Sequence, residues 1–444
     1  MLTKNRLFFF NKPYKIKLSW KNLTSFSLVL LFLPEFIHPE GNILHYICYF
    51  VAAVMLMTGL VRCRNLTREE KTFLLPLVFL FLIGSFHSGS DKFNYYKDMW
   101  YFSKPVLFIG AGIIAQKTGI KRNYFLGMIL YFSLALSLKH ICFFLLMPQL
   151  LAESLMQIRE VAGGGNLLIA FSVAYISRRK RFLEVKNFLN IPRLALLLIL
   201  YSSMLLSWSR TIFAVYLITM IFLERIYDIK YIKRSIGTIA FVGALLVCVF
   251  LFLNSTPMRA NIEEITRKIF SSYSEILVSS KYTNTGEISN WRGYETPLAI
   301  NKIANGSIGD QIWGYGFGAT VFIGFDDILG FGIYDIPLLH NGFIHIALKT
   351  GYLGVLLYIG FFFNLMKIIR KHKFIGDATG DLLAGILMSS FFTTLVITGY
   401  YNKSALNSTC IISGYLLSWI INNRRMSIQS TSKNNPYVAY NRSE

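Results

Sequence analysis

Apolar residues fall into about twelve membrane-length runs separated by polar segments. Such runs are typical of membrane-spanning α-helices, since about 20 apolar residues cross a hydrocarbon core of about 30 Å. The predicted spans cover residues 22–37, 43–61, 73–88, 100–116, 124–147, 163–177, 194–208, 211–224, 235–253, 341–366, 381–399 and 405–421. The pattern therefore predicts an all-α polytopic membrane protein.

Lysine and arginine positions predict the orientation of these spans, because basic residues accumulate in cytoplasmic connections. Every connection after an even-numbered span is basic, and those after odd-numbered spans are not. The basic stretch from Lys4 to Lys21 precedes an apolar run without a small-residue cleavage site, which indicates a retained first helix. We therefore expect a multi-pass membrane protein with both termini in the cytoplasm.

One long connection and the C-terminal end depart from this regular pattern. Residues 1–253 carry nine predicted spans, residues 254–340 form one large loop on the outer side of the membrane, and residues 341–425 carry spans ten to twelve. A loop of this length in a compact protein is usually functional. Residues 426–444 are rich in Ser, Asn and Lys, so we predict a disordered cytoplasmic tail.

Two helical segments are predicted within the large loop. After a helix-start signal at 255–257, isoleucines recur at helical spacing, with charged residues elsewhere on the turn, at Ile262, Ile265, Ile269 and Ile276. That arrangement suits a helix lying on the membrane surface. A second, shorter helix is predicted from Pro297 to Ile303.

The stretch 193–224 is too long to be one span. It contains neither Gly nor Pro and a single internal charge, Arg210. A continuous helix would be roughly 48 Å long, whereas the hydrocarbon core is about 30 Å thick. We therefore predict a hairpin that turns at residues 207–211, with two legs of about 14 residues, or about 21 Å each. Its tip should lie below the outer headgroups.

The composition excludes several classes of protein. Hydrophobic residues make up 54% of the 444 positions and charged residues 15%, and mean hydropathy is +0.48. The formal net charge of +22 would suggest nucleic acid in a soluble chain. Here the basic residues lie in the connections that are predicted to be cytoplasmic, so we expect no nucleic-acid partner. The five cysteines lack C-x-x-C spacing, which argues against a disulfide framework or a zinc site.

Arg210, at the predicted hairpin tip, has two interpretations. An arginine at a helix end can extend to the membrane surface. Alternatively, it binds an anion: a charge at the centre of a membrane helix costs roughly 2.5–3.5 kcal/mol. A phosphate about 4 Å away, at an effective dielectric near 20, contributes about 4 kcal/mol in return. The short legs favour an anionic ligand.

The loop segment 290–295 combines an arginine with aromatic residues. Arg292 is either a solvated loop residue or a bidentate phosphate ligand. Trp291 and Tyr294 on either side of it offer stacking surfaces of the kind that sugars use. Glu295 is either a structural partner of Arg292 or a second carboxylate in the site, and both interpretations stay open.

A histidine and an asparagine stand where the loop enters span ten. His340 either caps that helix or acts as a general base or hydrogen-bond donor, because imidazole exchanges protons near neutral pH. Asn341 is a candidate supporting residue. His345 lies on a different face of the helix, so we rank it well below His340.

Two other loop features give weaker signals. The glycine-rich segment 313–318 does not belong to a βαβ unit, so we predict a tight turn that lets the loop pack closely on the membrane helices. The carboxylates of Asp326, Asp327 and Asp335 have no spacing that demands a metal ion.

The order of these motifs resembles the O-antigen polymerase and O-antigen ligase superfamily, which makes bacterial surface polysaccharides. Ser-x-Ser-Arg at 207–210 is followed by Trp-Arg at 291–292 and Trp-Gly-Tyr-Gly-Phe-Gly at 313–318. His-Asn-Gly-Phe-Ile-His at 340–345 comes last. The resemblance extends from about residue 195 to 365, and the first 190 residues match only as a run of spans.

The resemblance implies a GT-C-like glycosyltransferase fold with its active site on the periplasmic face. It implies undecaprenyl-diphosphate-linked oligosaccharides as donor and acceptor, without nucleotide sugar, metal or other cofactor. In the family, arginines that match Arg210 and Arg292 contact the donor pyrophosphate. A histidine that matches His340 is required for transfer.

Three functions follow as alternatives. The leading one is a polymerase that transfers the growing glycan onto another lipid-linked repeat, with a chain-length regulator and a flippase as expected partners. The second is a ligase that transfers finished glycan to lipid A-core. The third is a lipid-linked-glycan flippase or other transporter. Such transporters commonly show two related halves, and this sequence shows no half-to-half similarity.

Overall fold

The structure is a computed structural model, and it describes most of the chain outside the first part of the large loop. The described residues are 19–36, 43–62, 66–86, 91–147, 166–207, 209–225, 291–322, 335–372, 378–397, 399–401 and 407–434. Within them the chain forms fourteen α-helices, two short 3₁₀ helices and one two-stranded sheet.

The elements follow one another in the order of the predicted spans. Those before the large loop are α1 (Trp20–Phe32), η1 (Leu33–Phe36), α2 (Ile43–Arg62), α3 (Arg68–Phe86), α4 (Lys92–Lys117), α5 (Arg122–Leu146), α7 (Leu167–Ile176), α8 (Arg179–Leu183), α9 (Arg193–Leu206) and α10 (Arg210–Leu223). Those within and after it are α15 (Trp291–Ala304), α16 (Ile308–Trp313), β1 (Val321–Phe322), β2 (Asp335–Ile336), α17 (Gly342–His372), α18 (Ala378–Ile397), η3 (Gly399–Tyr401) and α19 (Asn407–Asn434).

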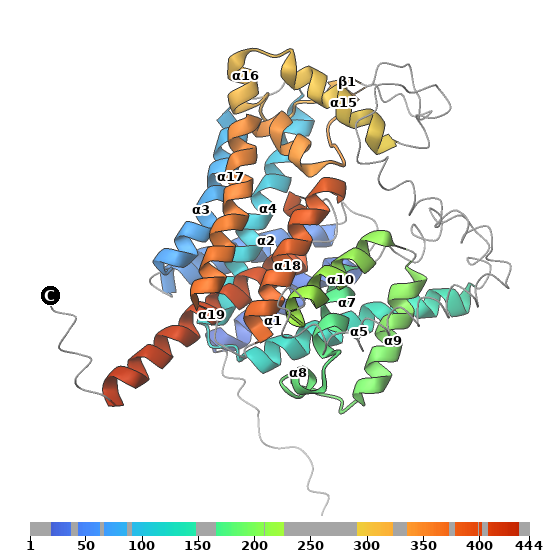
Figure 1. The fold of residues 1–444 in the computed structure, drawn as a ribbon, viewed down its shortest axis with the longest axis vertical. Helices are drawn as coiled ribbons and strands as arrows, with labels where there is room; N and C mark the ends of the chain where they lie inside the picture. The colour runs from blue at the N-terminus through green and yellow to red at the C-terminus, as the bar shows by residue number, and fades with distance from the viewer. Residues whose placement is uncertain are drawn as a thin grey trace, which may run out of the picture.

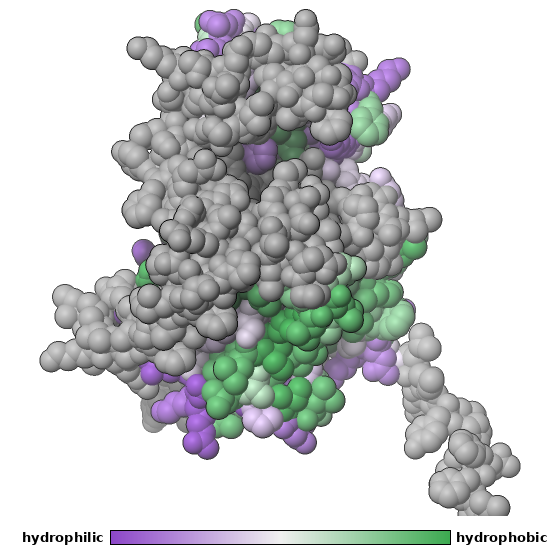
Figure 2. Space-filling view, turned by 90° about the vertical axis from the view of Figure 1, so that its right-hand side faces the viewer, coloured by the Kyte–Doolittle hydropathy of each residue, from purple (hydrophilic) through white to green (hydrophobic). Residues whose placement is uncertain are grey.

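Long helices form a bundle, and the described part of the large loop covers one end of it. Figure 1 shows α15 and α16 at the top of the bundle and α8 at the bottom. A second view shows a continuous apolar surface bordered below by hydrophilic residues (Figure 2). That is the surface expected of a lipid-facing wall that stops at a polar boundary.

The helical prediction is confirmed at eleven of the twelve predicted spans, and the span at 235–253 lies outside the described residues. Among the described helices, three are long and apolar enough to cross a membrane by length and composition: α5, α17 and residues Ala378–Val396 of α18. The apolar helices α7, α9 and α10 are shorter. The protein is thus an all-α membrane protein.

The predicted hairpin is present in the structure. α9 ends at Leu206 and α10 begins at Arg210, so the chain turns within the predicted residues 207–211. Each leg has 14 residues, which corresponds to about 21 Å. The two legs are linked where the hydroxyl groups of Tyr201 and Tyr216 lie 2.7 Å apart.

A cluster of arginines lies at the end of this hairpin opposite the turn, where α9 begins and α10 ends. Glu224, directly after α10, lies 2.5 Å from Arg178 and 2.7 Å from Arg181. Arg193, at the start of α9, donates to a backbone carbonyl just before α8 at 3.0 Å. Burial raises the pKa of the Glu224 carboxyl, but hydrogen bonds and charge from the two arginines more than offset this and leave its pKa lowered. At this basic end of the bundle, α9 begins and α10 ends.

Other ion pairs gather helix ends at the same level. Lys117, which ends α4, is 3.0 Å from Glu70 in the first turn of α3. Arg225, directly after α10, is 3.0 Å from Asp381 in the first turn of α18. Each of these ion pairs therefore joins two helix ends that the basic pattern assigns to the same side of the membrane.

The centre of the bundle is a close crossing of α4 and α19. A Cβ atom on Gly112 would lie 2.1 Å from the carbonyl oxygen of Ile411, and one on Gly414 would lie 2.0 Å from that of Ile109. Small residues at membrane helix crossings let two backbones approach in this way. The crossing joins the first and last thirds of the chain.

Helix α19 continues beyond the predicted last span. It reaches Asn434, whereas the predicted span ends at residue 421, and residues 435–444 lie outside the described residues. Extending an existing helix gains one hydrogen bond per residue and avoids the cost of nucleation.

Within the large loop, α15 confirms the helix predicted at 297–303, although it begins earlier, at Trp291. The predicted membrane-surface helix at 262–276 lies outside the described residues. The two short strands pair antiparallel, with Val321 opposite Ile336. The described loop is thus two helices and a strand pair stacked on the bundle.

Candidate functional site

A bend in α17 forms the base of the site. Gly351 has φ 67° and ψ −173°, so the chain leaves the helical conformation there and resumes it afterwards. Positive φ favours glycine, and a Cβ at Gly351 would lie 2.1 Å from the carbonyl oxygen of Ile312. The segments 342–350 and 351–372 are therefore two helices, and the bend frees backbone carbonyls at the end of the first.

The glycine-rich segment 314–318 satisfies those carbonyls. The backbone N–H groups of Tyr315 and Gly316 donate to the carbonyl oxygens of Leu348 and Lys349 at 2.9 and 3.1 Å. The predicted tight turn that packs on the membrane helices is confirmed. The sequence did not indicate which part of the bundle this turn packs on, which is the interrupted turn of α17.

Phe317 fixes the same segment from the other side. Its backbone N–H donates to the carbonyl oxygen of Gly84 at 2.8 Å. Its fully buried ring packs against Phe81 on α3 and Phe102 on α4, with ring centroids 5.9 and 4.9 Å apart. The loop therefore inserts, as a packed element, into the end of the bundle that it covers.

A buried ion pair secures the inserted segment. The Lys349 ammonium on α17 lies 2.5 Å from the Asp98 carboxylate on α4, and both side chains are almost completely buried. The Lys349 ammonium also donates to the carbonyl oxygen of Ala319, and the Asp98 carboxylate accepts from the Gly318 N–H at 2.8 Å. The pair is thus stabilised by backbone groups of the loop, which in turn is held between α4 and α17.

The inserted segment supports α15 and the strand pair. Lys302 on α15 donates to the carbonyl oxygen of Thr320 at 2.5 Å, and the Tyr315 hydroxyl donates to the carbonyl oxygen of Lys302 at 2.7 Å. A small apolar core joins α15, the strands and α17 through Ala299, Ile303, Ala319, Val321, Leu339, Ala347 and Leu348. These contacts fix where the start of α15 meets the entry to α17.

At that meeting point, Glu295 and His340 form a dyad. The Glu295 carboxylate accepts a hydrogen bond from the backbone N–H of His340 and lies 3.0 Å from Nδ1 of its ring. Glu295 thus has His340 as a partner, 45 residues later in the chain, and the predicted pairing of Glu295 with Arg292 stays a prediction because the side chain of Arg292 lies outside the described residues.

Glu295 determines which nitrogen of His340 can act. A carboxylate accepts hydrogen bonds, so Nδ1 carries the hydrogen in the neutral ring and Nε2 carries the lone pair. The Glu295 side chain is fully buried, whereas 45% of the His340 side chain is exposed. The dyad thus offers an acceptor nitrogen at the surface, with a buried negative charge behind it to stabilise the imidazolium.

Asn341, not His340, caps the helix. Its side-chain oxygen accepts hydrogen bonds from the N–H groups of Phe343 and Ile344 at 3.1 and 3.3 Å. This is the usual arrangement of an asparagine N-cap. The interpretation of His340 as a polar cap is therefore wrong, and Asn341 supports the site by starting the helix directly behind the histidine.

The other predicted site residues lie on separate parts of the fold. Arg210 is the half-buried first residue of α10, a helix that packs on α7 and α18. Trp291 and Arg292 begin α15, one turn before Glu295, and their side chains lie outside the described residues. Tyr294 is 8% exposed, so its ring is not a stacking surface for a sugar as predicted.

His345 is fully buried in α17. Its ring lies 5.8 Å from that of Phe102, and neither ring nitrogen has a hydrogen-bond partner within the described residues. Asp335 is exposed in β2, and Asp326 and Asp327 lie outside the described residues. In the part of the chain that the structure describes, no group of three or more His, Cys, Asp or Glu residues could hold a metal ion.

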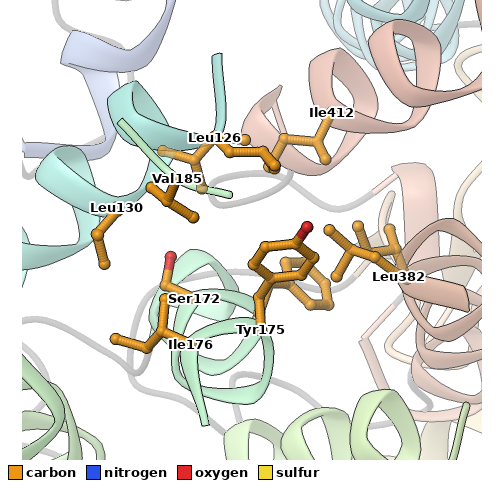
Figure 3. Close-up of a pocket in the computed structure, with 11 residues that line it drawn as sticks. Leu126, Leu130, Ser172, Tyr175, Ile176, Val185, Leu382 and Ile412 are labelled. Atoms are coloured by element: carbon orange, nitrogen blue, oxygen red, sulfur yellow. The ribbon is translucent and has the colours of Figure 1, made fainter. Parts of the chain in front are cut away.

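A small apolar pocket lies away from the dyad, near the ion-paired end (Figure 3). Leu126 and Leu130 of α5, Ile176 of α7, Leu382 of α18 and Ile412 of α19 line it. The volume open to water-sized spheres is about 20 Å³, roughly enough for one water molecule. Because none of its lining residues is charged, we regard it as a packing defect between helices.

Three residues that organise the site escaped the sequence analysis: Asp98, Lys302 and Lys349. For Lys349 a signal was available, since a lysine within the predicted span 341–366 is the kind of intramembrane charge that usually has a partner and a role. Asp98 lies just outside the predicted span 100–116. A carboxylate at that position is common and gives no sign of a special role. Lys302 has no distinguishing sequence feature.

The chain was also compared with known proteins. No protein-family model matches it, and no curated protein sequence matches it significantly.

Proposed function

We propose that this protein transfers glycosyl groups from an undecaprenyl-diphosphate-linked glycan on the periplasmic face of the bacterial inner membrane. The observation that carries the proposal is the dyad, in which buried Glu295 orients exposed His340. The order of sequence motifs supports the lipid-linked donor. The proposal includes a GT-C-like fold of about twelve spans, with both termini in the cytoplasm.

The chemistry is a single inverting displacement. The acceptor hydroxyl oxygen forms a bond to C1 of the donor sugar while the bond from C1 to the diphosphate oxygen breaks. The hydroxyl proton passes to Nε2 of His340, and the bonding electron pair leaves with undecaprenyl diphosphate. General base catalysis of this kind typically contributes about 10²- to 10⁴-fold to the rate.

Arg210 and Arg292 are the proposed ligands of the diphosphate. Charge accumulates on the leaving group as its bond to C1 breaks, and two guanidinium groups can stabilise it through charge-assisted hydrogen bonds. Two placements support these roles. Arg292 lies one turn before Glu295 on α15, and Arg210 lies at the end of α10 opposite its ion-paired end. The mechanism requires no cofactor.

A polymerase is the leading form of this activity, and a ligase is the alternative. Both use the same donor and differ in the acceptor. A polymerase accepts the sugar end of a second lipid-linked repeat, and a ligase accepts lipid A-core. The dyad serves either acceptor, because it acts only on the proton of the attacking hydroxyl.

The test is in vitro transfer with purified protein, a defined lipid-linked repeat and, separately, lipid A-core, each with and without chelator. We expect chain extension on the lipid-linked repeat, unaffected by chelator. His340→Ala and Arg210→Ala should each abolish extension. Asp335→Asn changes an exposed loop carboxylate and serves as the matched control, with full activity expected.

Three outcomes would contradict the proposal in different parts. Normal polymer length in His340→Ala would remove the base, and normal length in Arg210→Ala would remove that residue from the mechanism. Transfer to lipid A-core alone would replace the polymerase with the ligase. Wild-type protein that moves lipid-linked glycan across vesicles without forming a glycosidic bond would replace the enzyme with a transporter.

A further inference from the structure

The short helix α16 displays an apolar face on the outer surface of the molecule. This face consists of Ile308, Ile312 and Trp313, which are 77%, 43% and 47% exposed. Their spacing places them on one side of the helix, since residues four apart are neighbours on a helix surface. Large apolar side chains grouped in this way on a short helix normally have an apolar neighbour.

The helix that carries this exposed face is held in place by its own contacts. Ser307 and Asp310 form a reciprocal capping box, in which the Asp310 N–H donates to the Ser307 hydroxyl at 3.1 Å and the Ser307 N–H donates to the Asp310 carboxylate at 3.0 Å. Its other end runs directly into the inserted segment 314–318. The helix is therefore held at both ends while its apolar face points outward.

That face continues the lipid-facing side of α17. Tyr352, Leu356 and Phe363 are 51%, 66% and 72% exposed on this candidate membrane helix. The backbone carbonyl group of Ile312 lies next to Gly351, and Gly351 directly precedes Tyr352. Figure 1 shows α16 beside the upper ends of α3 and α17. The apolar face therefore begins where the lipid-facing side of the span ends.

We propose that α16 is a membrane-surface anchor whose apolar face is covered by the headgroup and upper acyl region of the outer leaflet. Tryptophan is enriched at that level of a bilayer. Short amphipathic helices also lie there with their apolar side toward the acyl chains. Continuity with the lipid-facing side of α17 selects lipid as the occupant over a second copy of the chain or another protein.

The anchor fixes the depth of the dyad, a consequence that rests on the proposed function. The segment from Gly351 to Met366, where the predicted span ends ahead of the basic residues, has 16 residues and spans about 24 Å, which is most of one hydrocarbon core of about 30 Å. The outer boundary of the membrane thus falls near Gly351 and Trp313. Residues 342–350 and the dyad lie outside it. His340 then meets the sugar end of a lipid-linked glycan, while the polyprenyl tail stays in the membrane below.

The experiment measures the depth of Trp313 in vesicles that contain the full-length protein and brominated phosphatidylcholines. Bromines placed near the headgroup, at mid-chain or near the chain end quench tryptophan emission at the corresponding depth. The chain has six tryptophans, so the contribution of Trp313 is the difference between wild type and Trp313→Phe. We expect headgroup-proximal bromines to quench that contribution at least about twofold more than chain-end bromines, as for a helix inserted about 5–10 Å.

Two variants sharpen the result. Ile308→Ser combined with Ile312→Ser should weaken the headgroup-proximal quenching, because it removes the rest of the apolar face. Phe322→Ser changes an apolar side chain that is 58% exposed but outside this face, so it should leave the quenching unchanged.

Efficient quenching of Trp313 by aqueous iodide and none by brominated lipid would overturn the anchor. Protection from both quenchers that disappears as the protein is diluted in lipid would show that a second copy covers the face, and would also overturn it. Quenching does not depend on catalysis. An inactive protein with an inserted Trp313 would refute the proposed function and leave the anchor standing.

Discussion

Replacing Lys349 with methionine should destabilise the protein strongly, because it leaves the Asp98 carboxylate buried without its cation. Methionine keeps most of the length and all of the apolar character of the lysine stem. Asp98 would retain its 2.8 Å hydrogen bond from the Gly318 N–H but lose the ammonium 2.5 Å away. Removing one partner of a buried pair typically costs about 3–5 kcal/mol. That is a factor of roughly 10² to 10⁴ in the unfolding equilibrium.

The double variant distinguishes the interaction between the two side chains from the separate contribution of each residue to stability. With Lys349→Met and Asp98→Asn together, no buried charge is left alone. We therefore expect the combined loss of stability to fall short of the sum of the single losses by about 1–3 kcal/mol, as for directly contacting residues. Lys371→Met is the matched control on the same helix. Its side chain is 60% exposed and 3.5 Å from Glu69, and exposed pairs contribute at most about 1 kcal/mol.

The assay is equilibrium unfolding in mixed detergent micelles, combined with hydrogen exchange at the amides of Tyr315 and Gly316. Both amides are hydrogen-bonded into the bend of α17, so they should exchange faster in Lys349→Met and recover in part in the double variant. Unchanged stability and exchange in Lys349→Met would refute the role given to the pair. Strictly additive losses in the double variant would show that the two residues act independently.

Three further predictions concern the dyad, the bend and the arginine cluster. Glu295→Gln should lower the transfer rate by roughly 10²- to 10⁴-fold, because an amide cannot offset the charge of a protonated His340; normal turnover with purified variant would exclude the dyad. Gly351→Ala should cost about 1–3 kcal/mol, since φ is positive there and the new Cβ meets the Ile312 carbonyl; thermal unfolding at the wild-type temperature would contradict this. Glu224 has a lowered pKa in the folded protein, so its stabilising contribution is complete above its ordinary value of 4.5 and is lost as the pH falls further, through the folded value. Glu224→Gln should therefore flatten the acid side of a stability profile measured from pH 7 to pH 3, and an unchanged profile would refute the assignment.

The helices and the hairpin were predictable because they follow from lengths along the chain. A 32-residue apolar stretch cannot fit a hydrocarbon core of about 30 Å as one helix, and the structure places the break at residues 207–209, just before α10. Basic residues at alternate helix ends likewise predicted which ends meet. These properties need only the sequence near each element.

The candidate site was predictable only in part, because it depends on contacts between distant segments. His340 was selected from its place at the entry to span ten. Its pairing with Glu295 depends on how α15 rests on the inserted segment, and no periodicity encodes that arrangement. The bend at Gly351 was equally hidden, since a glycine within an apolar run can remain helical. Nor did the apolar pattern indicate that α19 continues past residue 421 to Asn434, because composition does not reveal where a helix already formed will end.

The ion pair between α4 and α17 also sets an order for biosynthesis. Asp98 is synthesised early in translation, whereas Lys349 emerges from the ribosome about 250 residues later. Until then, each intermediate carries an unmatched carboxylate at the outer end of α4, and the segment 314–318 lacks the carbonyls on which it docks. The surface that carries the dyad of Glu295 and His340 therefore cannot assemble progressively from the N-terminus. It closes in one late event, once the last third of the polypeptide has been inserted.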